Sequence, residues 1–339
     1  METLCEAIRS FTIGPAVTHR NLTVFPLIGE PPGERGYRTL EEALKAGSAR
    51  VTEVSEAGSV PNLMFANEGS DPVLLVDGEE LKGAKQNRVL NLTLLVAGGK
   101  TLVIPVSCVE AGRWAGHSRA FECSSDFIYS SGRARKVAQV SGAMARGLGR
   151  VSDQSAIWSD IHAKHERMGV SSPTSAMAEA YRQRSTDLEG YVAALRPVEA
   201  QAGAVFALDG RVAGVELFDH PETLGILMAK LVRSYALDAV ETAEAPSAIP
   251  PSEAARAFLE ELADAGMEAF PALAMGEDVR MSGRRLVGAA LIESGRVVHL
   301  SAFRLAEDLG HGAGDSTQSR MASYLMRRRF SRNRGSEVA

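Results

Sequence analysis

Four glycine-containing turn signals separate apolar, β-rich runs in this sequence, and they constrain its fold more than any other feature. The signals are Asp77-Gly78, Ala97-Gly-Gly-Lys100, Asp209-Gly210 and Ser294-Gly295. Because glycine accepts the positive φ angles of tight turns, each signal predicts a β-hairpin and together they predict mainly antiparallel pairing. The β-rich runs cover residues 11–17, 22–27, 62–66, 73–76, 89–96, 101–106, 204–208, 212–218, 286–292 and 297–303.

Helical patterns lie between these runs. The segment Thr39-Leu-Glu-Glu42 is a capping box, which predicts that a short helix begins there and ends near Gly47. Hairpins that alternate with helices favour an α+β fold, with mainly antiparallel sheet and helices packed on it, over a doubly wound parallel fold. The other predicted helices cover residues 133–196 (two or three helices, broken near 169–173), 223–240 and 252–266.

Composition divides the 339 residues into four parts. A β-rich part over residues 1–125 precedes a helical segment over 126–200. An α+β part over 201–309 is predicted to pack with the first part as one composite unit, and residues 310–339 are predicted to form a flexible basic tail. The whole chain carries a net charge of −5, so its body is acidic. Because phosphate neutralisation dominates nucleic-acid binding, nucleic acid is not predicted as a partner, except through the basic tail.

Three features bear on the compartment. No apolar run reaches the length of a membrane-spanning helix, so no membrane association is predicted. The N-terminal sequence METLCEAIRSFTIGP lacks the positive start of a secretory signal. The three cysteines are few and odd in number, which is typical of a protein in the reducing cytoplasm.

The segment from Glu79 to Arg88 is a dense polar motif beside strongly apolar runs. Burying such a stretch is costly unless its polar groups find partners. Lys and Arg bind phosphate through charge-assisted hydrogen bonds, and amides pair with hydrogen-bonding edges, so the composition suits a phosphorylated nucleoside. A polar hairpin or edge strand with surface ion pairs is the alternative. The candidate ligand-binding residues are Lys82, Lys85, Gln86, Asn87 and Arg88.

A second polar cluster follows the next apolar run, where a strand is predicted to end and a loop to begin. Loops at strand ends commonly carry binding or catalytic side chains. Cys108 could act as a nucleophile if His117 or another base approached it, or it could be a small buried hydrophobic residue. Arg113 and Trp114 could hold a phosphate and stack on a base, or Trp114 could anchor the loop to the core.

Five sequence blocks carry a family resemblance. They are VDGEELKGAKQNRVLN, PVSCVEAGRW, AVFALDGRVAGVELF, KLVRSYALDAVE and VVHLSAF. In this order they resemble the ARG and rhodanese–phosphatase-superfamily-associated protein domain family, an uncharacterised family named for its association with ADP-ribosylglycohydrolases and phosphatase-like proteins. The resemblance implies a role in handling ADP-ribose or a related NAD-derived nucleotide. It carries over no catalytic residue.

Three functions are consistent with these residues. The favoured one is binding of a phosphorylated, NAD-derived nucleotide by the polar motif, helped by Arg113 and Trp114. The second is an enzyme acting on such a nucleotide, with Glu80 or Glu110 as the general base and Cys108 as a candidate nucleophile. The third is a structural or protein-interaction module. No metal site is predicted, because the sequence has neither a CxxC pair nor an HExxH motif, and it specifies no cofactor or oligomeric state.

Overall fold

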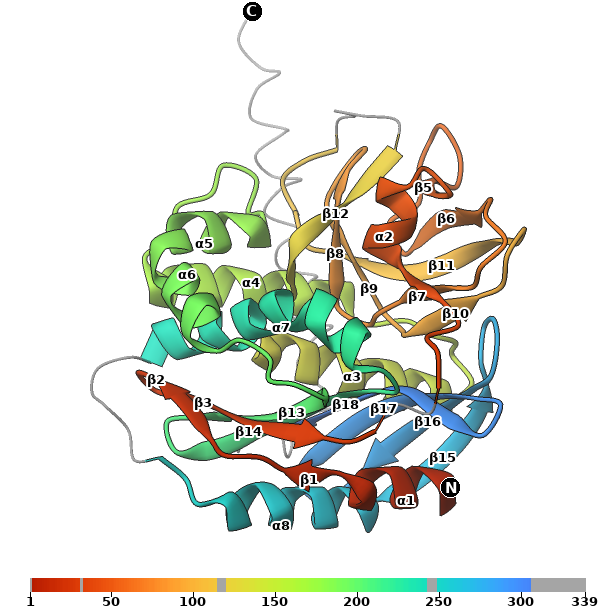
Figure 1. Cartoon of the computed structure of the whole chain (residues 1–339). Helices are drawn as coiled ribbons and strands as arrows, with labels where there is room; N and C mark the ends of the chain where they lie inside the picture. The colour runs from red at the N-terminus through yellow and green to blue at the C-terminus, as the bar shows by residue number, and fades with distance from the viewer. Residues whose placement is uncertain (1, 31–32, 115–119, 243–248, 306–339) are drawn as a thin grey trace, which may run out of the picture. The chain divides into compact units, whose positions relative to one another are not determined.

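A nine-stranded antiparallel sheet lies below a closed six-stranded barrel in the view of Figure 1. The computed structural model describes residues 2–30, 33–114, 120–242 and 249–305. The chain divides into two units, Met1–Arg304 and Leu305–Ala339, and the predicted basic tail lies outside the described residues. The strands follow one another across the large sheet as β1 (Thr12–Ile13), β3 (Leu22–Ile28), β13 (Gln201–Leu208), β14 (Arg211–Phe218), β18 (Arg296–Arg304), β17 (Leu286–Glu293), β16 (Glu277–Ser282) and β15 (Gly266–Pro271), with β2 (Val17–His19) also paired to β3.

The barrel is built from the N-terminal part of the chain, and its strands pair antiparallel. A small three-stranded sheet accompanies it, in which β10 (Leu94–Val96) and β4 (Arg38–Thr39) pair with β7 (Val73–Leu75), antiparallel and parallel respectively. The α+β class with mainly antiparallel sheet is therefore confirmed. The barrel strands, in order around it, are β11 (Thr101–Cys108), β6 (Asn62–Asn67), β5 (Ala49–Glu53), β12 (Ala120–Phe127), β8 (Glu79–Gly83) and β9 (Arg88–Leu90).

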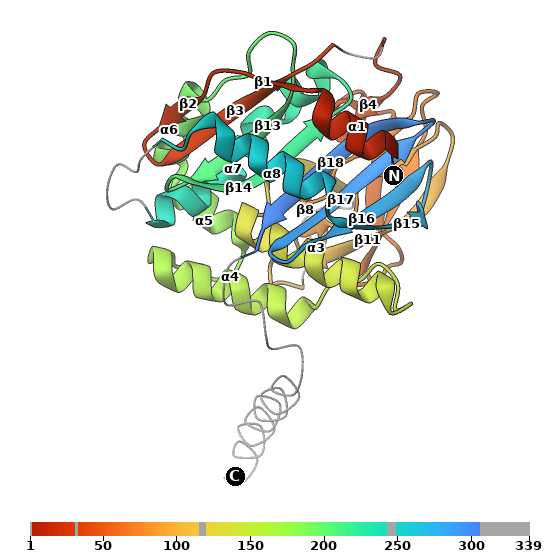
Figure 2. The same ribbon diagram turned by 90° about the horizontal axis from the view of Figure 1, so that it is seen from below.

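Helices cover both faces of the large sheet. Two of them, α1 (Glu2–Ser10) and α8 (Ser252–Ala263), pack on its outer face, as Figure 2 shows from below. On the other face, α3 (Ser130–Ala145) and α7 (Pro221–Thr242) contact the sheet, and α7 also contacts barrel strand β12. The remaining helices flank these layers: α2 (Leu40–Lys45) packs on the barrel, and α4 (Gln154–Met168), α5 (Met177–Gln183) and α6 (Ser185–Ala194) lie beside α3 and α7.

Two apolar cores stabilise the unit. One lies under the large sheet, where Leu4 and Ile8 of α1 and Phe258 and Leu262 of α8 pack against it. The other fills the barrel and includes Val140 of α3. Within the described residues, no helix is long and apolar enough to cross a membrane.

A layer of buried charges lies between the sheet and the barrel. Arg133 of α3 is fully buried and donates from Nε to Asp77 Oδ2 at 3.0 Å and from Nη1 to Glu216 Oε1 at 2.6 Å. Lys136 of the same helix also pairs with Asp77. His299 of β18 lies 3.3 Å from the second oxygen of Glu216. Asp77 follows β7 of the small sheet, Glu216 belongs to β14 of the large sheet, and Arg133 belongs to α3. The network therefore joins the small sheet, the large sheet and the helix between them.

Two of the four predicted hairpins are confirmed. Asp209-Gly210 joins the antiparallel strands β13 and β14, and Ser294-Gly295 joins β17 and β18. The φ angles are 49° at Asp209, 77° at Gly210, 50° at Ser294 and 74° at Gly295. Positive φ at both central residues is the signature of the tight turn that matches the twist of a hairpin.

The other two predicted hairpins are wrong. At Asp77-Gly78 the chain leaves β7 of the small sheet and enters β8 of the barrel, and these two strands do not pair. Residues 97–100 similarly connect β10 to β11, which pair with different partners. Glycine is needed for close packing here: a Cβ on Gly98 would lie 2.2 Å from the carbonyl oxygen of Ser70. At the passage from β7 to β8, Asp77 is buried in ion pairs with Arg133 and Lys136 instead of forming a hairpin turn.

The predicted helices are confirmed, with one difference in number. Residues 130–194 form four helices instead of two or three, and the predicted break falls between α4 and α5. The capping box is present: the Glu42 backbone N–H donates to Thr39 Oγ1 at 3.3 Å, and the Thr39 backbone N–H donates to Glu42 Oε2 at 2.8 Å.

Replacing Thr39 with alanine is expected to lower the free energy of unfolding by about 1 kcal/mol, because the first turn of α2 loses a cap. Urea denaturation of the parent and the variant measures this difference. Thr39→Ser is the matched control, because serine caps at least as well as threonine. Equal stability of the alanine variant and the parent would show that the capping box does not stabilise α2.

Candidate functional site

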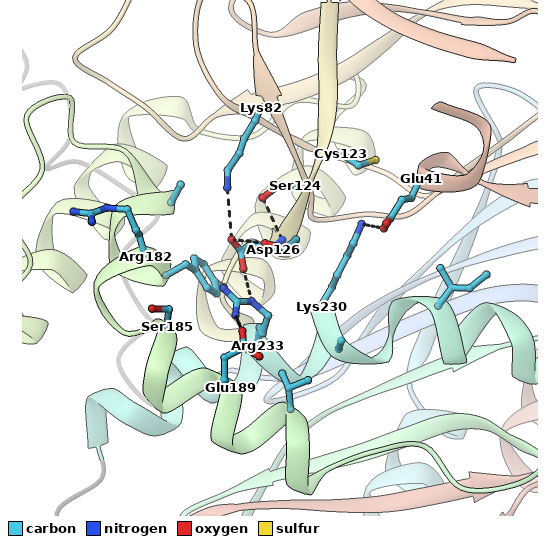
Figure 3. A pocket seen from close by; sticks show the side chains of 16 residues that line it. Glu41, Lys82, Cys123, Ser124, Asp126, Arg182, Ser185, Glu189, Lys230 and Arg233 are labelled. Carbon is cyan, nitrogen blue, oxygen red and sulfur yellow. Dashed lines mark hydrogen bonds and ion pairs between the residues drawn. The ribbon is translucent and has the colours of Figure 1, made fainter. Parts of the chain in front are cut away.

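A cleft of about 670 Å³ opens between the barrel and the helices that flank it (Figure 3). Strand β12 supplies residues 123–126 to its wall, and Lys82 comes from the adjacent strand β8. Helices α5 and α6 supply residues between 178 and 192, and α7 supplies residues between 226 and 233. A cleft of this volume falls within the range of small-molecule sites.

The lining of the cleft combines apolar side chains with many charged and hydroxyl-bearing ones. Its cations outnumber its acidic side chains by four to three, and three serines add hydroxyl groups. On α7 the lining residues recur every three or four positions, which turns one helix face towards the cleft. The cations are Lys82, Arg182, Lys230 and Arg233, the acids are Glu41, Asp126 and Glu189, and the serines are Ser124, Ser125 and Ser185.

Three of the cations pair closely with carboxylates, and Arg182 does so with Glu179 of its own helix. Arg233 donates from Nε to Asp126 Oδ1 at 2.7 Å and from Nη1 to Glu189 at 3.0 Å. Lys230 Nζ lies 2.7 Å from Glu41 Oε2 and 3.3 Å from Glu79 Oε1. Burial alone would lower the pKa of Lys230, but these two glutamates outweigh it and raise the pKa, so the ammonium stays charged. These ion pairs hold the Arg233 and Lys230 side chains in fixed positions, and the carboxylates balance their charges.

Lys82 is the cation with the loosest contacts. Its Nζ lies 3.6 Å from Glu80 Oε2 and 3.8 Å from Asp126 Oδ2, both beyond ordinary hydrogen-bond length. Its side chain is 41% exposed, and Figure 3 shows it reaching into the cleft from above. Lys82 can therefore turn to an anion in the cleft at little cost.

Glu80 lies behind Lys82 and is 1% exposed. Its Oε1 accepts from Asn87 Nδ2 at 3.3 Å, and its Oε2 has no hydrogen-bond donor of good geometry among the described residues. Burial raises the pKa of Glu80 to about 7; Lys82 opposes this shift and the Asp126 carboxylate adds to it. A carboxyl group with a pKa near neutrality has the acidity of a general base, and Lys82, 3.6 Å away, is its connection to the cleft, which Glu80 itself does not line.

The rest of the polar motif faces other parts of the protein. Lys85 Nζ donates to the carbonyl oxygens of Glu56 and Ala57 at 2.5 and 2.7 Å. Arg88 is fully buried and donates from Nε to the Val60 carbonyl oxygen at 3.2 Å. These side chains fasten the loop between β5 and β6. Of the five residues proposed from the motif as ligand-binding, only Lys82 lines this cleft.

The second predicted cluster is also joined to the motif by hydrogen bonds. Gln86 Nε2 donates to the Glu110 carbonyl oxygen at 3.0 Å, and the Asn87 backbone N–H donates to Glu110 Oε2 at 3.1 Å. Arg113 donates from Nη2 to Asn87 Oδ1 at 3.1 Å and to Glu110 Oε2 at 2.6 Å. Thr174 donates to the other Glu110 oxygen. Burial alone would raise the pKa of Glu110, but these donors outweigh it and lower the pKa.

Cys108 and Trp114 lie in the same region. Cys108 is fully buried, and its Sγ lies 3.2 Å from Gln86 Oε1. Burial raises the pKa of this thiol, which disfavours the nucleophilic thiolate. Its proposed base, His117, lies outside the described residues. Trp114 is 48% exposed, and Lys85 Nζ lies 5.3 Å from its ring centre. The structure thus brings Gln86, Asn87, Cys108, Glu110 and Arg113 together, away from the cleft.

Most of the cleft residues were not predicted from the sequence. One signal could have indicated two of them: Lys230 and Arg233 interrupt the apolar pattern of α7 at a spacing of three. Asp126 has no comparable signal, because its partner Arg233 is 107 residues away in the chain. In the part of the chain that the structure describes, no cluster of His, Cys, Asp or Glu could hold a metal ion.

Comparisons with known proteins bear on the family. No curated protein matches the sequence, and no solved structure matches either. The family model of the ARG and Rhodanese-Phosphatase-superfamily-associated Protein domain matches residues 10–303, which is most of the chain. The chain therefore belongs to this family.

Proposed function

We propose that the cleft binds a phosphorylated, NAD-derived nucleotide such as ADP-ribose. The observation that carries this proposal is the cleft of about 670 Å³ whose cations outnumber its acids and include the loosely held Lys82. The family resemblance supports the same class of ligand. The proposal moves the binding site from the whole polar motif to the cleft that only Lys82 of the motif's candidate residues lines.

The cleft offers a partner for each part of such a ligand. Lys82 supplies a charged donor for phosphate oxygens, and the 73%-exposed Arg182 supplies a second one that would exchange its pair with Glu179 for the ligand. Ser124 and Ser185 can hydrogen-bond a phosphate or a sugar, and the Glu189 carboxylate can accept from ribose hydroxyls. Two or three charge-assisted hydrogen bonds, each contributing about 1.5–3 kcal/mol, supply about 3–9 kcal/mol. Micromolar affinity is about 8 kcal/mol, so burial of the base and sugar rings has to offset the entropic costs of association.

Two lysine variants test the proposal. Lys82→Ala is expected to weaken ADP-ribose binding about 10- to 100-fold, because it removes one charge-assisted contact. Lys85→Ala removes the same charge three residues along the chain, outside the cleft, from a side chain bonded to the Glu56 and Ala57 carbonyl oxygens. It is expected to leave the affinity unchanged. Isothermal titration calorimetry with the purified full chain measures both dissociation constants.

Two results would contradict the proposal. One is parent protein that binds no ADP-ribose at millimolar concentration. The other is loss of binding in Lys85→Ala with retention in Lys82→Ala, which would place the ligand near Trp114. Thermal unfolding of each variant controls for folding.

One observation favours a second function, an enzyme acting on the same nucleotide. Glu80 has a pKa of about 7, as suits a general base. Although it does not line the cleft, it lies 3.6 Å from Lys82, which does and which would link it to a substrate there. Glu110 is less suited, because its carboxylate is saturated with donors outside the cleft. A Glu80→Gln variant that binds ADP-ribose with unchanged affinity but no longer converts it would support this function. Equal turnover in parent and variant would exclude Glu80 as the base.

A further inference from the structure

A second cleft adjoins the first. It has a volume of about 410 Å³ and is lined by residues of α2, β5 and β12. Glu41 and Cys123 line both clefts. On β12 the boundary is simple: residues 120–123 line the second cleft, and residues 123–126 line the first. The two clefts therefore lie next to each other along β12 and meet at Cys123.

We propose that the two clefts are halves of one binding groove along β12, and that the second cleft takes the second ring-bearing half of a diphosphate-bridged ligand. This inference rests on the proposed function, because it assumes that the first cleft binds a phosphorylated nucleotide. It adds a second binding site and restricts the ligand to molecules with two cyclic groups joined by an anionic bridge, which excludes mononucleotides.

The length of the groove supports a two-part ligand. From Ala120 to Asp126 the strand makes six steps of about 3.3 Å, or roughly 20 Å. A mononucleotide is shorter than this and would leave one cleft empty. The lysines at the junction are Lys230 and Lys45, which share the Glu41 carboxylate on the wall common to both clefts. An anionic bridge that runs from this wall towards Lys82, whose Nζ lies 3.8 Å from Asp126 Oδ2 in the first cleft, would place one half of the ligand in each cleft.

The two clefts also differ in chemistry. The second has an apolar part formed by Leu44, Ala49, Ala120 and Phe121, with the exposed Lys45 and Arg50 beside it. The first carries most of the charges and all three serines. An apolar wall with a charged rim suits the flat face of a base or sugar ring, whereas cations and hydroxyls suit phosphate and ribose.

Glu41 forms the wall that the clefts share. Its carboxylate pairs with Lys230, which lines the first cleft, at 2.7 Å, and with Lys45, which lines the second. The Glu41 carboxylate thus pairs with one lysine from each cleft. A bridging diphosphate would compete with Glu41 for both lysines, so loss of the Glu41 charge should favour the ligand.

Fragment binding tests the proposal. AMP and ribose 5-phosphate are the two halves of ADP-ribose, and calorimetry gives the affinity of each. Ala120→Trp fills the second cleft from an exposed position on β12, and Thr101→Trp, at an exposed position of β11 outside both clefts, is the matched control. Ala120→Trp is expected to weaken binding of ADP-ribose and of one fragment about 10-fold or more, and to leave the other fragment and the control unchanged.

Substitution of Glu41, on the wall that the clefts share, should strengthen ligand binding, whereas Ala120→Trp should weaken it. Glu41→Gln is expected to tighten ADP-ribose binding several-fold, while Glu261→Gln, which removes a carboxylate from a solvent-accessible pair with Arg304 outside both clefts, changes it little. Unchanged ADP-ribose affinity in a folded Ala120→Trp variant overturns the second cleft as a subsite, as does unchanged affinity in Glu41→Gln. Failure of the proposed function itself gives a different result, because no probe then binds the parent protein.

Discussion

Replacing Arg133 with alanine is expected to lower the free energy of unfolding by about 3–5 kcal/mol. Arg133 is fully buried between the large sheet and the barrel, and it pairs with both Asp77 and Glu216. Removing one member of a buried ion network leaves the remaining charges without compensation, and their desolvation is no longer offset. Lys136 still pairs with Asp77, whereas Glu216 keeps only His299 near its carboxylate among these side chains.

Urea denaturation measures this loss, and a second arginine provides the control. Arg9 pairs with Asp264, and the two side chains are 58% and 76% exposed. Because exposed pairs contribute about 0–1 kcal/mol, Arg9→Ala should change stability little. A loss of under about 1 kcal/mol in Arg133→Ala as well would show that the buried network does not hold the three layers together.

Glu80→Gln is expected to stabilise the protein at pH 8 by about 3 kcal/mol, since one pKa unit corresponds to about 1.4 kcal/mol. Burial raises the pKa of Glu80 from 4.5 to about 7, so between these values the folded protein binds a proton that the unfolded chain does not. The free energy of unfolding therefore falls as the pH rises through this window. Glutamine removes the buried charge, and its benefit should vanish below about pH 5.

Glu110→Gln is the matched control, because the pKa of Glu110 is shifted in the opposite direction and the expected stability change has the opposite sign. Donors from Arg113, Asn87 and Thr174 outweigh burial and lower the pKa of Glu110. Its ionised form therefore stabilises the fold above the unfolded-state pKa, and this contribution is lost as the pH falls through the folded-state pKa. Glu110→Gln should destabilise at pH 7. Urea denaturation of both variants from pH 4.5 to 8 measures these stability changes. If both variants stabilised the protein, or both destabilised it, the environments described for Glu80 and Glu110 would be contradicted.

Local turn chemistry accounts for what the sequence predicted well. Asp209-Gly210 and Ser294-Gly295 each supply two residues with positive φ, and the strands on both sides pair directly. Thr39 and Glu42 likewise determine a helix start within four residues. At Asp77-Gly78 the deciding partners, Arg133 and Lys136, lie more than fifty residues away, so the same type of signal gave a wrong hairpin.

Several elements had no clear pattern in the sequence. Strand β12 reads AFECSSDF, with polar residues at positions that face the cleft or other buried polar groups. Strand β15 is mostly exposed and lies at the sheet edge, so it lacks an apolar face. Neither shows the alternation of apolar and polar residues that strand prediction depends on.

The candidate site was predicted only in part. Polarity correctly indicated that the segment 79–88 must find partners, but a polar side chain can satisfy this need with a ligand or with the protein's own carbonyl groups. Lys85 and Arg88 contact backbone carbonyls, whereas Lys82 lines the cleft. Adjacent residues of one motif thus differ in role because strand pairing turns them to different surroundings, which sequence composition does not encode.

A crystal structure of the protein with ADP-ribose tests the central claim most directly. The account predicts electron density for the ligand along β12, with a phosphate oxygen within hydrogen-bond distance of Lys82 Nζ and the Ser124 and Arg233 side chains nearby. Density over Trp114, beside Lys85 and with the cleft empty, would contradict it and would return the site to the second polar cluster.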